Sequence, residues 1–176
     1  NWRKIDILVN NAGLAAGLNS IDEGHTDDWD TMIDTNVKGL LYVSRTVIPW
    51  MRSRTTGHID NIGSTAAKLA YAKGNVYCAT KAAVDAITQG MRIDLLPYRI
   101  KVTAVHPGAA ETEFSLVRFK GDEDKAKEVY KGFIPLTAQD VADVVYYCTS
   151  LPPHVCINDL VMTPLQQANA YYIDKK

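Results

Sequence analysis

Short apolar runs alternate with longer helical patterns along this chain, and the alternation constrains its fold more than any other feature. The apolar runs predict strands at residues 5–9, 58–62, 100–105 and 155–162, and the helical patterns cover residues 27–54, 75–96 and 137–149. Strands that alternate with helices in this way form parallel sheets, because each crossover helix returns the chain to the same end of the sheet. The sequence therefore predicts an α/β protein built on a parallel sheet.

Residues 109–132 follow the third predicted strand without a regular pattern. This segment contains Thr112, Phe114 and Arg118, followed by the charged run 120–125. Loops of this length often carry substrate contacts and lids, so we expect a mobile flap with a short helix. The charged run by itself predicts only a solvated face.

The balance of charge and apolar residues excludes several classes of partner. The net charge of −1 offers no basic stripe for nucleic acid or an anionic membrane surface, and neither is expected as a partner. No apolar run reaches the ~18 residues that a membrane span needs. The cysteines, Cys78, Cys148 and Cys156, are odd in number and lack metal-ligand spacing, which favours free thiols in a reducing compartment. We therefore expect a cytoplasmic protein.

Residues 61–81 contain three side chains suited to proton transfer. Ser64 follows the strand predicted at residues 58–62. Tyr77 and Lys81 are four residues apart, so they share one face of the following helix. An ammonium group near a phenol favours the phenolate and lowers the phenol pKa from about 10. The same spacing also occurs twice in the polar tail, as Tyr171 with Lys175 and Tyr172 with Lys176. The pair alone is therefore not specific.

Two further positions stand out because polar groups occupy apolar patterns. Asn36 lies within the apolar stripe of the helical pattern 27–54, where a buried amide needs hydrogen-bond partners, so we expect either a helix kink or a site residue. Asp60 lies inside the second predicted strand, where an unpaired carboxylate is costly, and the sequence offers no account of it.

Taken together, these marks resemble the short-chain dehydrogenase/reductase family from its fourth strand to its C-terminus. The matching motifs, in chain order, are Asn10-Asn11-Ala12-Gly13, Asn36, Ser64, Tyr77 with Lys81, and Pro107-Gly108 with Thr112. The resemblance implies a Rossmann-like, doubly wound parallel sheet. Residues 118–122 and 151–155 further resemble the NADP-dependent serine/3-hydroxy acid dehydrogenase group, whereas Asp60 and the pair Ala109-Ala110 depart from the family pattern.

The resemblance also implies a reaction, namely reversible hydride transfer between a nicotinamide cofactor and a small hydroxy acid or another secondary alcohol. It implies that Tyr77 is the acid/base and that Lys81 depresses the Tyr77 pKa. It also implies that Ser64 binds the substrate oxygen and that Asn36 holds a water. NADP is the expected cofactor, with NAD left open, and its expected contacts are Asn10, Ala12, Gly13, Tyr77, Lys81, Pro107, Gly108 and Thr112.

Arg118 is a second candidate for substrate binding, because a guanidinium group binds a carboxylate in a bidentate manner. The alternative is an ordinary surface arginine on the flap. A ketoacyl or carbonyl reductase of the same family remains an alternative function. A non-catalytic nucleotide-binding protein and an inactive fragment are alternatives from other classes.

No glycine-rich dinucleotide loop follows any predicted strand, although this loop normally opens the fold. We expect it to precede Asn1, so that residues 1–176 form the C-terminal part of a single Rossmann-like domain whose N-terminal βαβ portion is missing from this chain. By resemblance we also expect a homo-oligomer, either a tetramer or a dimer, with the stripe 40–48 facing another subunit or packing on its own sheet.

Overall fold

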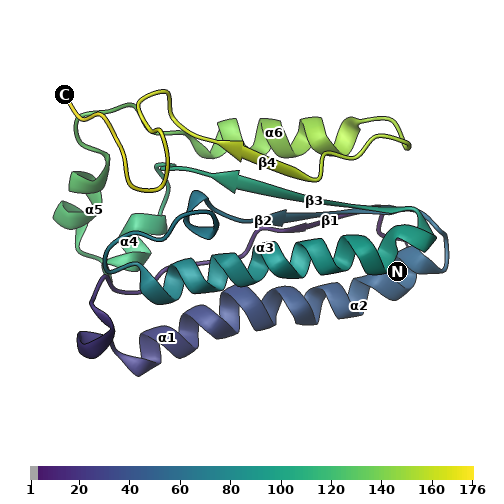
Figure 1. Cartoon of the computed structure of the whole chain (residues 1–176), viewed down its shortest axis with the longest axis horizontal. Helices are drawn as coiled ribbons and strands as arrows, with labels where there is room; N and C mark the ends of the chain where they lie inside the picture. Colours follow the sequence, from purple (N-terminus) through teal and green to yellow (C-terminus); the bar gives the residue numbers. More distant parts are fainter. Residues whose placement is uncertain (1–3) are drawn as a thin grey trace.

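The computed structural model describes residues 4–176, which form a parallel sheet with helices on both of its faces (Figure 1). The strands are hydrogen-bonded in the order β1-β2-β3-β4, and every pair is parallel. Their bounds are β1 Ile7–Asn10, β2 Gly57–Ile62, β3 Ile100–Pro107 and β4 Asp159–Met162. The predicted α/β fold with a Rossmann-like parallel sheet is confirmed.

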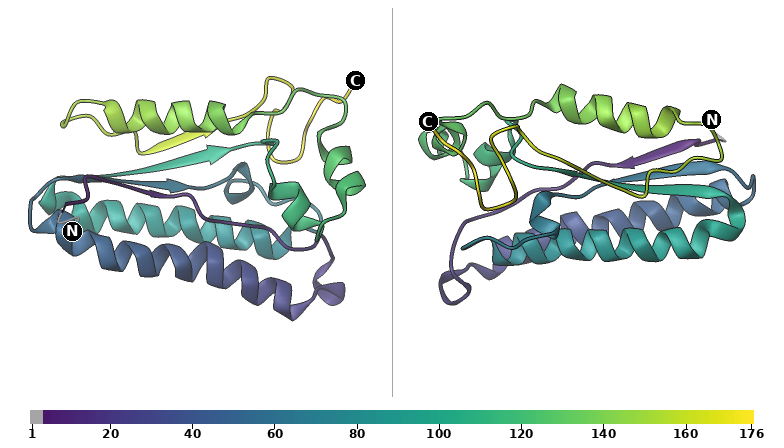
Figure 2. Two further views of the ribbon diagram at one scale, coloured as in Figure 1. Left: turned by 180° about the vertical axis from the view of Figure 1, so that it is seen from behind. Right: turned by 45° about the horizontal axis from the view of Figure 1, so that its top comes forward.

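The two faces of the sheet are covered unequally. The long helices α2 (Leu40–Arg52) and α3 (Asn75–Leu95) lie side by side on one face, and α6 (Ala138–Ser150) covers the other (Figures 1 and 2). Two short helices, α4 (Phe114–Arg118) and α5 (Glu123–Tyr130), stand at the end of the sheet toward which β3 runs. Among the described residues, no helix is long and apolar enough to cross a membrane.

Short helical turns complete the chain. The 3₁₀ turns are η1 (Ile21–Glu23), η3 (Thr65–Ala67) and η4 (Leu96–Tyr98).

Between α2 and α3, an apolar cluster packs against the sheet and consists of Val47, Met51, Ile59, Leu95, Ile100 and Val102. This cluster lies in the half of the molecule away from the carboxyl ends of the strands, which leaves those ends free for polar groups.

The helix predicted at residues 27–54 is continuous but not uniform. It consists of α1 (Thr26–Ile33), a π-helical turn η2 (Asp34–Gly39) and α2. The wider turn coincides with Asn36, which is only 2% exposed and hydrogen-bonds the backbone of Leu14. Such turns are typical of functional positions in helices. Of the two alternatives for Asn36, the helix distortion is present, and its place in the site stays a prediction.

Two boundaries differ from the prediction. The last strand begins at Asp159 instead of residue 155, because the side chain of Arg92 donates to the Val102 carbonyl that a longer strand would use. The segment 109–132 contains two helices, α4 and α5, where one was expected. The predicted cap of the following helix is confirmed, since Thr137 and Asp140 form a reciprocal capping box.

Asp60 in β2 lies on the sheet face toward α6, next to the buried pair His58 and Thr103. The side chain is fully buried, and neither carboxylate oxygen has a hydrogen-bond partner among residues 4–176. Burial raises its pKa from 3.8 to about 7. The strand therefore carries this residue at low cost only while the carboxyl group is protonated.

Candidate active site

A cleft of about 1050 Å³ opens at the carboxyl ends of the strands. Ligands of open α/β sheets bind at this edge because the loops that follow the strands meet there. The walls come from the loops after β1, β2 and β3, from α4 and α6, and from the C-terminal tail. The predicted site residues on these walls are Gly13, Ser64, Tyr77, Lys81, Pro107, Gly108, Thr112 and Arg118.

Tyr77 and Lys81 lie on the same face of α3, one turn apart, and both are buried at the floor of the cleft. The Tyr77 ring packs against Phe114 with their centroids 5.5 Å apart. The Lys81 ammonium group donates to the carbonyl oxygen of Ile62, at the end of β2, over 2.9 Å. The main chain at the end of β2 thus holds the lysine head group in the same cleft as Tyr77.

Burial dominates the ionisation of this pair. It raises the pKa of the Tyr77 phenol well above 10, against the lowering effects of a hydrogen bond with Ser64 and of the Arg118 charge. Burial also lowers the pKa of Lys81 to about 8. The expected depression of the Tyr77 pKa by Lys81 is not seen in this arrangement, because desolvation of the phenolate outweighs the nearby charges.

Ser64 stands immediately beyond β2 in an extended conformation and caps the short turn η3, where its hydroxyl oxygen accepts the N–H of Ala66 over 3.1 Å. Its own main-chain N–H donates to Nδ1 of His106 over 3.2 Å. The serine is therefore held by the Ala66 main chain on one side and by the His106 ring on the other. Its side chain faces the cleft near Tyr77.

Asn36 and Gly13 lie where the loop after β1 approaches α3. The Asn36 amide accepts the N–H of Leu14 over 2.8 Å and donates to the Leu14 carbonyl and to the Thr80 hydroxyl. A Cβ atom at Gly13 would lie 3.2 Å from Nζ of Lys81 and 3.3 Å from Oδ1 of Asn36, so a glycine lets the loop approach closely. The water predicted to bind at Asn36 stays a prediction.

Asn10, at the end of β1, belongs to a buried hydrogen-bond network next to the site. Its amide donates to Ser44 over 3.1 Å and to Asn61 over 2.7 Å, and Asn61 in turn donates to the Thr88 hydroxyl over 2.9 Å. Sequence reasoning missed Asn61, although its amide in an apolar strand was a signal of the same kind as Asn36. Asn10 and Ala12 do not line the cleft, so any contact between them and a cofactor stays a prediction.

The Pro107-Gly108 turn is fixed by the C-terminal tail. Gln167 is only 6% exposed, and its Oε1 accepts the N–H of Ala109 over 2.7 Å. A side chain at Gly108 would clash with this amide. Gln167 lines the cleft beside Ala109, one of the two small residues at which the sequence departs from the family pattern. Nothing in the local sequence of the tail indicated this role.

Arg118, at the end of α4, is half-buried and lies beside the ring of Tyr77. Its guanidinium group donates to the Tyr71 hydroxyl over 2.8 Å and to the carbonyl of Gly17 over 3.3 Å. Its central carbon lies 5.6 Å from the centroid of the Tyr77 ring. These contacts hold a positive charge at the rim of the cleft, within reach of a molecule bound at Tyr77.

Comparisons with known proteins agree with this geometry. The family model described as short chain dehydrogenase matches residues 1–122. The chain is 51% identical over 170 residues to the NADP-dependent 3-hydroxy acid dehydrogenase YdfG of Escherichia coli K12, covering 96% of this chain and 68% of that protein. It is 42% identical over 169 residues to the serine 3-dehydrogenase of Agrobacterium fabrum, covering 96% of this chain and 68% of that protein.

A solved structure shares both the fold and much of the sequence. The closed form of serine dehydrogenase complexed with NADP+ superimposes with a TM-score of 0.93 at 49% identity. The match covers 98% of this chain and 70% of that one. The chain thus spans about two thirds of the length of the relatives that it matches.

Proposed function

The chain belongs to the short-chain dehydrogenase family, and on that premise we propose that its cleft transfers hydride between NADP and the hydroxyl-bearing carbon of a small 3-hydroxy acid such as serine. It is an NADP-dependent oxidoreductase that acts on CH–OH groups. Two relatives bear the names 3-hydroxy acid dehydrogenase and serine 3-dehydrogenase, which supports the substrate class. The partners are therefore a small-molecule substrate and the cofactor.

The residues present fit a nicotinamide cofactor. Gly13 and Gly108 line the cleft without a Cβ atom, the first beside Nζ of Lys81 and the second against the Gln167 amide, and Lys81 lines the same cleft. NADP supplies the hydride acceptor for oxidation of the alcohol and the hydride donor for the reverse reaction. We assign Lys81 to binding its ribose, and Pro107, Gly108 and Thr112 to the wall beside its nicotinamide.

Tyr77 is the acid/base in this proposal. Because burial raises its pKa, the phenol carries its proton at neutral pH, which is the form that donates a proton to a carbonyl during reduction. When Tyr77 donates its proton in reduction it becomes a phenolate, which the positive charges of Lys81 and Arg118 stabilise. In oxidation this phenolate accepts the proton of the substrate hydroxyl and returns to the neutral phenol. Ser64 donates a hydrogen bond to the substrate oxygen as negative charge develops on it.

In this proposal, Arg118 makes the site prefer hydroxy acids as substrates. A planar guanidinium group binds a carboxylate through two parallel hydrogen bonds, and Arg118 lies beside the ring of Tyr77. In a 3-hydroxy acid, the carboxylate and the reacting hydroxyl are separated by two carbons of the chain, so one small molecule can contact both side chains. Tyr71 supports this arrangement through its hydrogen bond to the guanidinium group.

The observation that carries the proposal is the convergence of Ser64, Tyr77 and Lys81 in a single cleft. The test is the rate of NADPH formation by the complete protein with serine and a panel of 3-hydroxy acids. Tyr77→Phe should abolish turnover because it removes the proton acceptor and little else. Tyr172→Phe is the matched control, since it alters an exposed Y-x-x-x-K tyrosine of the tail. Near-normal turnover by Tyr77→Phe would refute the role.

We also propose that the protein is a cytoplasmic homo-oligomer, a dimer or tetramer, whose subunits meet through the long helices. Leu40 and Val47 pack inward, whereas Tyr42 and Trp50 on the same helix are 64% and 44% exposed. Large exposed aromatic residues on one helix favour a protein interface. Light scattering coupled to size exclusion would give the mass of the particle. Residues 1–176 are proposed to belong to a single Rossmann-like domain.

A further inference from the structure

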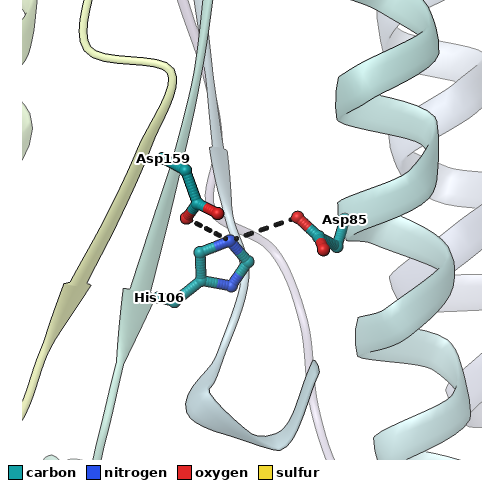
Figure 3. A group of neighbouring side chains, drawn as sticks. All are labelled: Asp85, His106 and Asp159. Carbon is teal, nitrogen blue, oxygen red and sulfur yellow. Dashed lines mark ion pairs between the residues drawn. The ribbon is translucent and has the colours of Figure 1, made fainter. Parts of the chain in front are cut away.

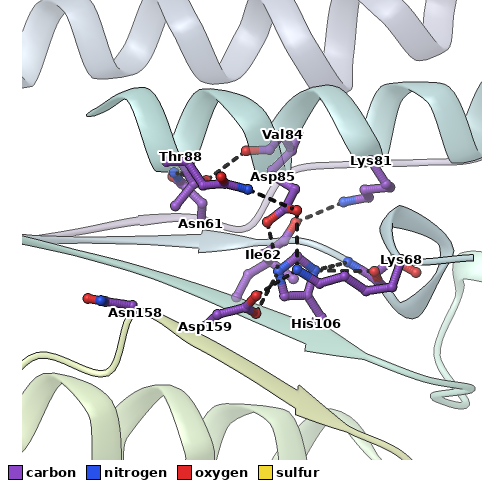
Figure 4. Close-up of polar contacts among 12 residues, drawn as sticks. Asn61, Ile62, Lys68, Lys81, Val84, Asp85, Thr88, His106, Asn158 and Asp159 are labelled. Carbon is purple, nitrogen blue, oxygen red and sulfur yellow. Dashed lines mark hydrogen bonds and ion pairs between the residues drawn. The ribbon is translucent and has the colours of Figure 1, made fainter. Parts of the chain in front are cut away.

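His106 lies within a cluster of charged side chains, Lys68, Asp85 and Asp159 (Figure 4). It also contacts the main chain of Ser64. It lies near the end of β3, and its side chain is fully buried. Nδ1 of the ring is 3.2 Å from both the main-chain nitrogen and the main-chain oxygen of Ser64. Any side chain at Gly63 would overlap the ring, so this glycine allows the imidazole to reach the serine backbone.

Two carboxylates face the opposite side of the ring. Nε2 is 3.1 Å from Oδ1 of Asp159 and 3.5 Å from Oδ1 of Asp85, as Figure 3 shows. It forms no regular hydrogen bond with any of residues 4–176. The ammonium group of Lys68 is 2.6 Å from Oδ2 of Asp159 and 3.2 Å from Oδ2 of Asp85. Each carboxylate therefore turns one oxygen toward the imidazole and the other toward the lysine.

This geometry resembles a metal site but serves another purpose. The ligand atoms of Asp85, His106 and Asp159 lie within 4.8 Å of one another, which is close enough for a metal ion. Lys68, however, already neutralises part of the negative charge and would repel a second cation. The carboxylates are better understood as groups that orient the imidazole.

The carboxylates select one tautomer of the neutral ring. Negative charge beside Nε2 favours a hydrogen on that nitrogen, which leaves a lone pair on Nδ1. Nδ1 can then accept the N–H of Ser64. In the other tautomer, a bare Nε2 lone pair would face two carboxylates, and the Ser64 N–H would lose its acceptor.

We propose that His106 is a positioning residue that holds Ser64 through its main-chain N–H, and that protonation of the ring releases this hydrogen bond. The proposal rests on the proposed function, in which Ser64 binds the substrate oxygen. A protonated ring carries hydrogen on both nitrogens. Nδ1 must then turn to the Ser64 carbonyl, which lies at the same distance, and the serine shifts relative to Tyr77.

The groups around the ring determine when this change occurs. Burial lowers the pKa of His106, and the positive charge of Lys68 lowers it further, whereas Asp159, the Ser64 carbonyl and Asp85 act in the opposite direction. The ring is therefore neutral at neutral pH, and Ser64 is held. Activity should fall when the pH drops through the pKa of His106.

The first test follows the His106 ring and the Ser64 amide by NMR in the labelled complete protein as the pH is lowered. We expect the Ser64 amide resonance to shift with the same midpoint as the ring. A Ser64 amide that does not respond would overturn the proposal. Because this readout needs no turnover, coupled titration in a protein without dehydrogenase activity would sink the proposed function alone.

The second test uses two substitutions that should shift the midpoint of the His106 titration in opposite directions. Lys68→Met removes a positive charge and should raise the midpoint, whereas Asp159→Asn removes a negative charge and should lower it. The acid limb of the kcat profile should move with each. Lys127→Met, on the exposed face of α5, is the control and should move neither. Equal midpoints in all variants would contradict the assignment.

The third test separates the acceptor from the bulk of the ring. Asn Oδ1 can accept the Ser64 N–H near the place of Nδ1, whereas a leucine of the same shape cannot. We expect His106→Leu to lower kcat about 10- to 100-fold, as displacement of a catalytic group does. His106→Asn should keep most of the natural kcat, but its kcat should no longer fall at low pH. Equal losses in both would refute the role. If neither variant folds, the NMR titration of the unsubstituted protein still decides.

Discussion

The buried carboxylate of Asp60 makes the stability of this protein depend on pH in a direction that can be calculated. The pKa of the side chain is 3.8 when exposed and about 7 in the fold, because burial penalises the charged form. Between these values the folded protein binds one proton more than the unfolded chain. The free energy of unfolding therefore falls as the pH rises from about 4 to 7, and the penalty is complete above pH 7.

The magnitude follows from the size of this shift. A shift from 3.8 to about 7 corresponds to about 4 kcal/mol, at about 1.4 kcal/mol per pKa unit. At pH 5 only about 2 kcal/mol of the penalty is present, since the unfolded carboxyl group is already ionised there and the folded one is not. Asp60→Asn keeps the shape of the side chain but cannot ionise. Its advantage over the natural protein should therefore grow by about 2–3 kcal/mol between pH 5 and pH 8.

The assay is urea unfolding of the natural protein and of Asp60→Asn at both pH values. All other ionisable groups are shared, so the change in the difference between the two proteins isolates Asp60. Asp143→Asn, on the exposed side of α6, is the control and should stay within about 0.5 kcal/mol of the natural protein at both pH values. An advantage that does not change with pH would refute the reasoning. If the stability advantage of Asp60→Asn over the natural protein became smaller as the pH rises, a positive group would have to pair with Asp60.

Three further substitutions test the site. Arg118→Ala should raise KM for 3-hydroxy acids at least 10-fold and leave KM for a neutral alcohol nearly unchanged, because only the carboxylate contact is lost. Equal changes in KM for both substrates would count against carboxylate binding. Gly13→Ala should raise KM for NADP and lower kcat, because its Cβ crowds Nζ of Lys81, and unaltered kinetics would show that the loop can yield. Asn61→Leu should lower the free energy of unfolding by about 1–3 kcal/mol in urea, because it takes an acceptor from the buried amide of Asn10, and unchanged stability would mean that this amide finds another partner.

Local pattern was enough to predict the elements of the fold and much of the site. The alternation of strands and helices, the capping box at Thr137 and the shared helix face of Tyr77 and Lys81 all depend on residues close together in the chain. Asn36 was recognisable because a polar amide interrupts an apolar stripe. Asp60 was equally visible, although its account required the burial and the pKa that only the fold provides.

The sequence by itself determined the parallel α/β architecture and indicated the candidate site residues, because hydrophobic period, caps and motif spacing are local properties. Only the tertiary structure decided which distant groups support them. Asn10 meets Asn61 across 51 residues, and Gln167 reaches Ala109 across 58. His106 meets Ser64, Asp85 and Asp159 from four different parts of the chain. The physical reason is that such contacts depend on strand order and register, which set side chains from separate elements within hydrogen-bonding distance and leave no periodic trace in the sequence.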